Sequence, residues 1–361
     1  MSSPKSSSAN KPGMLAKIRP LLSLSDHKRP WGAHVTVALA VGLPVIIAAW
    51  FDNFVIGSAA SIGGLASLYL RQTPLSHRMI TMALVSFGFC ASFTLSLLAG
   101  FNPWTIVAAL GFVAFWATFI SRYFAVPPPG SFFFITVACI ASAIPFDLSL
   151  LPQRAGLLLF GCMGASVLTL SYSLLQLLSG HTGGIHPAEP TEPRVVAILL
   201  ESATIAVFIA ASYLLALWLG FDKPYWAPIS CAAILQGASF RAIRHRNIHR
   251  IMGTAIGMGL TWGLFSLSPG PWTLALSIIV LIFIIEQLVT RNYGFAVIFI
   301  TPLTIILAEA ESASLHINQL VLQRMTDVIL GCSVGYVGGW VLYHQKAYRR
   351  LEQHLLHLFE K

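Results

Sequence analysis

The chain consists largely of long apolar runs separated by short charged, proline-containing or glycine-containing breaks, and this pattern restricts its fold more than any other feature. A helix needs about 20 mostly apolar residues to cross the hydrocarbon core of a bilayer. Several runs are short, which leaves tilted, broken or re-entrant helices open. We predict an all-α integral membrane protein of about twelve transmembrane helices, near 33–50, 53–70, 79–100, 103–121, 131–147, 155–178, 195–220, 224–240, 251–268, 271–290, 293–310 and 324–345.

Composition supports a multi-pass membrane protein. Hydrophobic residues make up 56% of the chain and charged residues 10%, whereas soluble domains carry about 25% charged residues. The sequence contains no nucleophile elbow, phosphate loop or pair of catalytic carboxylates, so we predict no enzyme and no cofactor. The five cysteines lie in apolar runs, where cysteine behaves as a small hydrophobe, and the histidines show no metal-ligand pattern, so no metal site is expected.

Lysines and arginines are distributed unequally between the two sides of the predicted bundle. With a cytoplasmic N-terminus, all but three of the 22 fall on the cytoplasmic side, the exceptions being Arg154, Lys223 and Arg324. This positive-inside pattern predicts an even number of spans in an inner (plasma) membrane, with both termini cytoplasmic. The basic run RAIRHRNIHR, at 241–250, is then a cytoplasmic loop between the eighth and ninth spans.

The two halves of the chain resemble each other at an offset of about 170 residues. Phe-Asp, Pro-Trp-Thr, Phe-Ile-Thr and Gln-Arg segments recur in the same order, and Arg78 and Arg250 each open the third span of a half. Six spans per half predict two parallel repeats related by a pseudo-two-fold axis along the membrane normal. The expected domains are a disordered basic tail (1–30), a first repeat (31–178), a cytoplasmic linker (179–194), a second repeat (195–345) and an amphipathic C-tail (346–361).

Arginines near the predicted cytoplasmic face are the first candidates for contact with a substrate. Arg78 and Arg250, with Arg246 nearby, would form an electropositive mouth that concentrates anions and pairs with carboxylates. Contact with lipid phosphates is the competing interpretation. Nucleic-acid binding is not expected, because the sequence contains no soluble reading domain.

Charged residues deeper in the spans are the second group of candidates. Glu286, Glu201 and Asp327 are acids at predicted membrane depth, where an ionisable group suggests function by default and burial favours proton binding and release. We rank Glu286 first for proton coupling, with an ion pair to an arginine as the alternative. Arg324 and Asp327 are three residues apart, and they form either a local salt bridge or an outer constriction for an anion.

Aromatic residues supply candidates for covering the apolar part of a substrate. Phe134 and Phe299 occupy equivalent places in the two halves, and Tyr225 and Trp226 open the eighth predicted span. Lipid contact, packing or an interfacial aromatic belt are the competing roles. The glycines of Gly253-x-x-x-Gly257 are interpreted as sites of close helix packing.

The run YWAPISCAAILQGASFRAIRHRNIHRIMGTAIGMG resembles a signature of the fusaric acid resistance and aromatic acid exporter group. Members of that group pair a Tyr-Trp-Ala-Pro-like span with an Arg-Ile-x-Gly-Thr-x-x-Gly helix start. The segment Arg324-x-x-Asp327-x-x-x-Gly331 also resembles the last span of that group. The resemblance covers about 195–345, and the first half follows only through the internal repeat. The residues that match the helix start are Arg250, Ile251, Gly253, Thr254 and Gly257.

This resemblance implies an exporter of aromatic or other organic acids, which we expect to carry a small organic anion through a basic passage between the repeats. The chain is also similar in plan to the plant aluminium-activated malate transporters, in which six-span subunits dimerise around a basic pore. The first half departs from the pattern because it lacks both motifs. A passive anion channel and a non-transporting membrane scaffold remain the alternatives. The expected partners are the anion and membrane lipids, and the chain is expected to be a monomer or homodimer.

Overall fold

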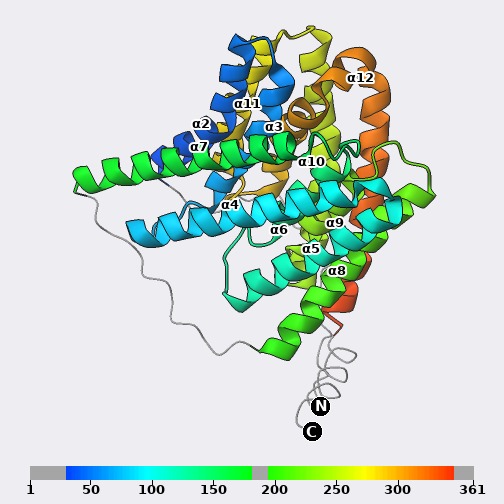
Figure 1. Cartoon of the computed structure of the whole chain (residues 1–361). Helices are drawn as coiled ribbons and strands as arrows, with labels where there is room; N and C mark the ends of the chain where they lie inside the picture. The colour runs from blue at the N-terminus through cyan, green and yellow to red at the C-terminus, as the bar shows by residue number, and fades with distance from the viewer. Residues whose placement is uncertain (1–29, 181–193, 345–361) are drawn as a thin grey trace, which may run out of the picture.

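The computed structural model describes residues 30–180 and 194–344, with the backbone alone at 309–316, and every regular element in this part is a helix (Figure 1). The predicted tails and linker lie almost wholly outside these residues. Seven helices are long and apolar enough to cross a membrane, which confirms the all-helical, multi-pass class. These are α2 (Trp31–Trp50), α4 (Leu75–Leu98, extended by η2, Ala99–Phe101), α5 (Pro103–Tyr123), α7 (Leu151–Leu178), α8 (Val195–Trp218), α11 (Pro271–Leu288) and residues Ile317–Leu342 of α12.

Four apolar helices in the described part are shorter: α3 (Phe54–Gly64) with η1 (Leu65–Tyr69), α6 (Phe132–Ser142), α9 (Trp226–Leu235) and residues Tyr293–Ala308 of α12. With ten residues, α9 rises about 15 Å, half the hydrocarbon thickness of about 30 Å. The spans predicted at 131–147 and 224–240 are therefore too long. Pro145 disfavours helical backbone at the residue before it, and a turn at 236–239 separates α9 from the next helix.

The basic run at 241–250 lies inside helix α10 (Phe240–Ser266), so the prediction that it forms a loop was wrong. Ser239 is the N-cap, and its Oγ accepts a hydrogen bond from the Ala242 N–H at 3.2 Å. Arginine is also a good helix former, so the charges do not interrupt the helix once the cap has started it. The arginines are therefore held in fixed positions on a helix surface.

Helix α12 (Tyr293–Leu342) is assigned as one element, whereas the sequence predicted separate spans at 293–310 and 324–345. Contacts with α10 show that its two arms nevertheless run in opposite directions. Along the first arm, Gly253 faces Val297 and Gly257 faces Thr301, so both numbers rise together. Along the second arm, Trp262 bonds to Asn318 and Asn247 to Cys332, so one number rises as the other falls. The chain therefore reverses between 308 and 317.

The most extensive contacts between the first half (30–180) and the second half (194–344) of the described chain are those of α2 with α11 and of α5 with α8. We call them the α2–α11 seam and the α5–α8 seam. Small residues permit close approach in both. Gly42 of α2 faces Ile279 of α11, and a Cβ added to Gly111 of α5 would lie 3.5 Å from the Cβ of Ala210 in α8.

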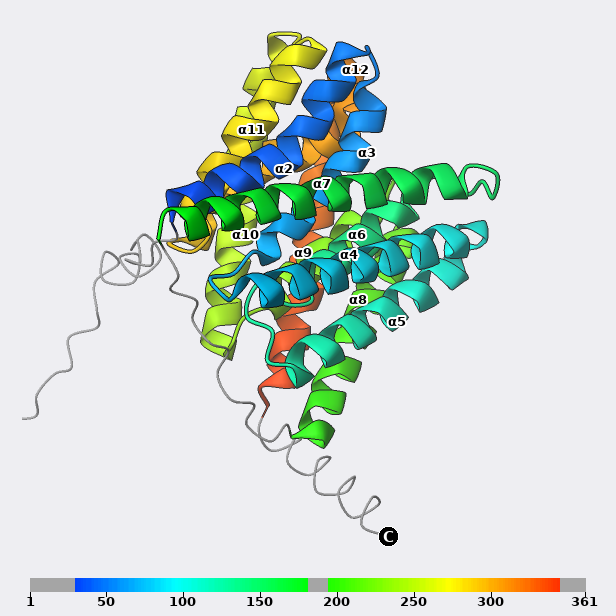
Figure 2. The same ribbon diagram turned by 60° about the vertical axis from the view of Figure 1, so that its left-hand side comes forward.

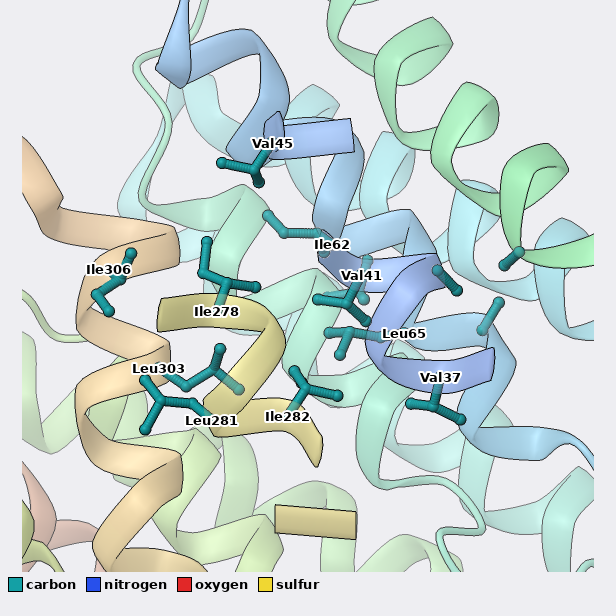
Figure 3. Packing of buried hydrophobic residues seen from close by; sticks show 14 of the residues in the cluster. Val37, Val41, Val45, Ile62, Leu65, Ile278, Leu281, Ile282, Leu303 and Ile306 are labelled. Atoms are coloured by element: carbon teal, nitrogen blue, oxygen red, sulfur yellow. The ribbon is translucent and has the colours of Figure 1, made fainter. Parts of the chain in front are cut away.

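Buried aliphatic side chains fill the α2–α11 seam, as Figure 3 shows. They come from α2, α3, α11 and the first arm of α12, and they belong to one continuous cluster. Smaller contacts of α3 with α12 and of α6 with α9 also join the halves. The labelled members are Val37, Val41, Val45, Ile62, Leu65, Ile278, Leu281, Ile282, Leu303 and Ile306.

The ends of the two halves lie on one side of the molecule. In Figure 2 the start of α2, the end of α7, the start of α8 and the end of α12 all lie toward the left and bottom of the view. Each half therefore leaves on the side where it enters. The basic N-terminal part of α10 lies on this side as well.

Candidate functional site

Arg250 is the most deeply buried arginine of the basic helix, with 4% of its surface exposed. One of its terminal nitrogens donates a hydrogen bond to Ser230 Oγ of α9 at 3.4 Å, and its Nε has no hydrogen-bond partner. The ion pairs among the described residues join His34 to Glu286 and Arg122 to Glu201, so no described carboxylate neutralises Arg250. A buried charge normally requires a partner of opposite sign. This guanidinium is therefore suited to receive an anion.

Arg246 lies one turn before Arg250 and connects α10 to two neighbouring helices. It donates a hydrogen bond to the Ala233 carbonyl of α9 at 2.9 Å, and its guanidinium carbon lies 4.7 Å from the centroid of the Tyr293 ring. Tyr293 begins α12. The side chain thus joins the end of one short helix to the beginning of another, and its charge remains partly accessible.

Gly253 and Gly257 explain how α10 approaches the first arm of α12 so closely. A Cβ at Gly253 would lie 2.8 Å from Val297 Cβ, and one at Gly257 would lie 2.6 Å from the Ile298 carbonyl oxygen. Both distances are shorter than ordinary contacts, so only glycine fits without displacing the neighbouring helix. These glycines have a packing role, and they hold the helix that carries Arg250.

Arg78 makes all its described contacts within the first half. It donates hydrogen bonds to the Thr73 carbonyl at 2.7 Å, Ser173 Oγ at 3.0 Å and Gln176 Oε1 at 2.7 Å. Arg78 and Arg250 therefore share a place in the sequence repeat but differ in environment. The described contacts do not bring the two guanidinium groups together.

Trp226, Arg324 and Asp327 form a second buried cluster, between α9 and the two arms of α12. The Arg324 guanidinium carbon lies 3.1 Å from the centroid of the Trp226 ring, and a terminal nitrogen donates to Thr304 Oγ1 at 3.1 Å. Asp327 is buried one turn further along α12. Neither Tyr225 nor Trp226 can belong to an exposed aromatic belt, because α9 is buried along its whole length.

The predicted phenylalanines take part in packing. Phe134 meets Tyr69 and Phe89 edge to face, with ring centroids 5.6 and 5.1 Å apart. Gly88 leaves room for it, since a Cβ there would lie 2.5 Å from the Phe134 ring. Phe299 packs against the larger hydrophobic cluster.

The two predicted proton-coupling glutamates occupy the two seams. Glu201 of α8 pairs with Arg122 of α5 at 2.7 Å, which fits the ion-pair interpretation. Tyr343, which follows α12, lies near this pair, and burial and the Glu201 carboxylate raise the pKa of its phenol. Glu286 of α11 instead lies 3.8 Å from His34 Nδ1 of α2, with both side chains almost completely buried.

Sequence reasoning missed His34. The signal was present, because His34 is the one ionisable side chain of its predicted span, and an ionisable group at membrane depth suggests function. We applied that rule to acids and not to histidine.

Comparison with known proteins places the second half of the chain in a family. Residues 209–338 match the model of the fusaric acid resistance protein-like family. The uncharacterized membrane protein YvaC of Bacillus subtilis (strain 168) is 30% identical over 43% of this chain, and the match covers 25% of YvaC. The p-hydroxybenzoic acid efflux pump subunit AaeB of Musicola paradisiaca (strain Ech703) is 28% identical over 35% of this chain and 22% of AaeB.

The aligned part thus spans about a quarter of the length of these relatives. No solved structure matches the chain. The family match falls on the helices that carry Arg246, Arg250, Trp226 and Arg324, and it agrees with the resemblance found in the sequence. Residues 209–338 of this multi-pass membrane protein are a fusaric acid resistance protein-like region.

Proposed function

We propose that the chain is an inner-membrane exporter of aromatic or other organic carboxylic acids, built from two parallel six-helix repeats. The arrangement of the seams supports this plan. The α2–α11 seam joins the first helix of one half to the fourth of the other, and the α5–α8 seam does the same with the halves exchanged. A two-fold axis along the membrane normal relates two such contacts. The helix ends gathered on one side in Figure 2 fit six passes per half.

The observation that carries the proposed function is the buried Arg250 guanidinium without a described carboxylate partner. Arginine stays charged in proteins and binds carboxylates in a planar, two-pronged geometry. A carboxylate substrate that reached Arg250 would neutralise a charge that the fold leaves uncompensated. Binding would therefore gain strength from the unfavourable ligand-free state.

Other candidates take supporting roles in this proposal. Arg246 and Arg78 attract the anion on the side where the helix ends gather, and Arg324 over Trp226 provides a second positive position along α12. Tyr225, Phe134 and Phe299 act mainly through packing, which fixes the walls of the passage. Proton coupling is assigned to Glu286, with Glu201 and Asp327 as the other buried or half-buried acids.

Flux measurements on the full chain in proteoliposomes test the proposal. The AaeB relative makes p-hydroxybenzoate the first substrate to try. Vesicles loaded with this acid should release it through the protein, and an imposed pH gradient should drive release against its concentration gradient. Flux that follows only the electrochemical gradient indicates a channel, and the absence of flux for a panel of organic anions contradicts both transport hypotheses.

Arg250→Gln tests the site itself. A hydrogen bond to a charged group contributes about 1.5–3 kcal/mol, so the half-saturating substrate concentration should rise about tenfold or more. Arg244→Gln is the matched control, because Arg244 is exposed on the same helix. The ligand-free Arg250→Gln protein should be at least as stable as the original, because the substitution removes a buried charge. Equal half-saturation in all three proteins would refute the role of Arg250.

A further inference from the structure

Each seam between the halves contains one acid and one base, contributed from opposite sides. The α2–α11 seam has His34 and Glu286, and the α5–α8 seam has Arg122 and Glu201. All four lie near corresponding ends of their helices: the histidine and Glu201 close to the start of α2 and α8, their partners close to the end of α11 and α5. The seams are therefore equivalent in position and in the sign of their charges when the histidine is protonated.

The two pairs differ in chemistry. Arginine keeps its charge throughout the physiological range, whereas the charge of histidine changes between about pH 5 and 8. They also differ in environment, since the side chains of Arg122 and Glu201 are 42% and 28% exposed and those of His34 and Glu286 are 4% and 3% exposed. Water can screen the first pair but not the second. Loss of one charge therefore has a larger effect in the α2–α11 seam.

His34 and Glu286 are the only ionisable side chains of α2 and α11. Phe283 of α11 lies edge-on to the His34 ring at 6.5 Å. Tyr172 of α7 touches Gly32, two residues before His34, and its hydroxyl accepts a hydrogen bond from Gln176. Ionisable groups on other packed elements have contacts of their own: Tyr69 with the Gly130 carbonyl, Tyr293 with Arg246, and Arg324 with Trp226 and Thr304.

We propose that His34 and Glu286 together form a proton-binding site within the α2–α11 seam, and that Arg122 and Glu201 form its non-titrating counterpart. With one proton shared between them, His34 and Glu286 have no net charge, either as an ion pair or as two neutral groups. Removal of that proton leaves a buried carboxylate beside a neutral imidazole, which costs free energy in a medium of low polarity. Deprotonation therefore loosens the α2–α11 seam and leaves the α5–α8 seam closed.

This site deepens the proposed function, because it identifies the proton acceptor of the exporter as a pair of residues and names the helix contact on which the proton acts. It predicts that one proton controls one of two equivalent seams, so the halves separate asymmetrically. The use of that movement for transport rests on the proposed function. The pH response of the seam does not, and it can be measured without any substrate.

Hydrogen–deuterium exchange of the full chain in detergent at pH 6 and pH 8, divided by the intrinsic exchange rate at each pH, tests the proposal. The ratio of charged to neutral histidine changes up to about 100-fold over this interval. Protection of α2 and α11 should accordingly fall about tenfold to 100-fold as the pH rises, while that of α5 and α8 stays constant. A fall shared by all four helices, or no fall in α2 and α11, would overturn it.

Two exchanges provide matched controls. His34→Arg should make protection of α2 and α11 independent of pH, and Arg122→His should introduce a pH-dependent loss in α5 and α8. His34→Gln keeps a neutral side chain at every pH and should show the low protection at pH 6 as well, which tests the proposal if the arginine variant fails to fold. A His34→Gln protein that keeps the pH response of the original would assign that response to another group. Loss of transport with an unchanged exchange pattern would count against the proposed function and leave the pair intact.

Discussion

Substitution of Gly257 by alanine tests how closely α10 must approach α12. The added Cβ would lie 2.6 Å from the Ile298 carbonyl oxygen and 2.7 Å from Thr301 Cβ. An ordinary contact needs about 3.4 Å, so α10 or the first arm of α12 must move by about 0.8 Å, in a region where backbone supplies one of the two obstacles. Overpacking of this kind costs about 1–3 kcal/mol.

Gly259→Ala is the matched control for this prediction. Gly259 lies on the same helix, two residues further along, and a Cβ there would meet nothing within 4 Å. Both substitutions gain the same helix propensity, about 0.8–1 kcal/mol, so that contribution cancels in the comparison. The Gly257→Ala protein should therefore be less stable than the Gly259→Ala protein by about 1–3 kcal/mol.

Reversible unfolding in mixed micelles, followed by circular dichroism as the denaturing detergent is increased, measures this difference. Anion binding offers a second readout, because the displaced helix carries Arg250 two turns away. Two variants of equal stability would refute the close approach of α10 and α12. Equal stability would also remove the reason given for a glycine at this position.

Two further predictions concern buried aromatic side chains. Phe134→Ala should lower the free energy of unfolding by about 3 kcal/mol, because it leaves a cavity between Tyr69 and Phe89; Phe87→Ala, whose side chain is 74% exposed, should cost far less in the same unfolding assay. Trp226→Leu removes the ring beneath Arg324 and should cost about 2 kcal/mol or more. Trp104→Leu is its control, because Trp104 is exposed. A Trp226 variant no less stable than the Trp104 variant would contradict a stabilising role for the stacked guanidinium.

The membrane class and the approximate position of each helix could be predicted, because apolar length is a local property of the sequence. Helix ends were predicted less well where a local cap competed with composition. The basic run at 241–250 was expected in a loop because it is charged, but Ser239 starts a helix ahead of it. Similarly, hydropathy could not reveal that α9 stops at Leu235, because the turn that follows depends on tertiary contacts such as the bond from Tyr343 to the Gly237 carbonyl.

The site was predictable by residue type and not by pairing. Arg250 was identified from its position at a helix start, but its burial against Ser230 depends on how α9 packs on α10. The glutamates were identified from their depth, whereas their partners come from helices of the other half, about 80 residues away for Glu201 and about 250 for Glu286. Spacing within one helix carries no information about such contacts. Arg78 shows the reverse case, since its equivalent place in the repeat did not produce an equivalent environment.

The exchanged packing of α2 with α11 and of α5 with α8 has a consequence for assembly. Helices that have inserted into lipid associate afterwards, through close packing and polar contacts between their surfaces. A half produced separately would insert on its own and keep two such surfaces ready for a complementary polypeptide. Co-expression of 1–187 and 188–361 as separate polypeptides should therefore reconstitute one particle, whereas either fragment alone should recruit a second copy of itself.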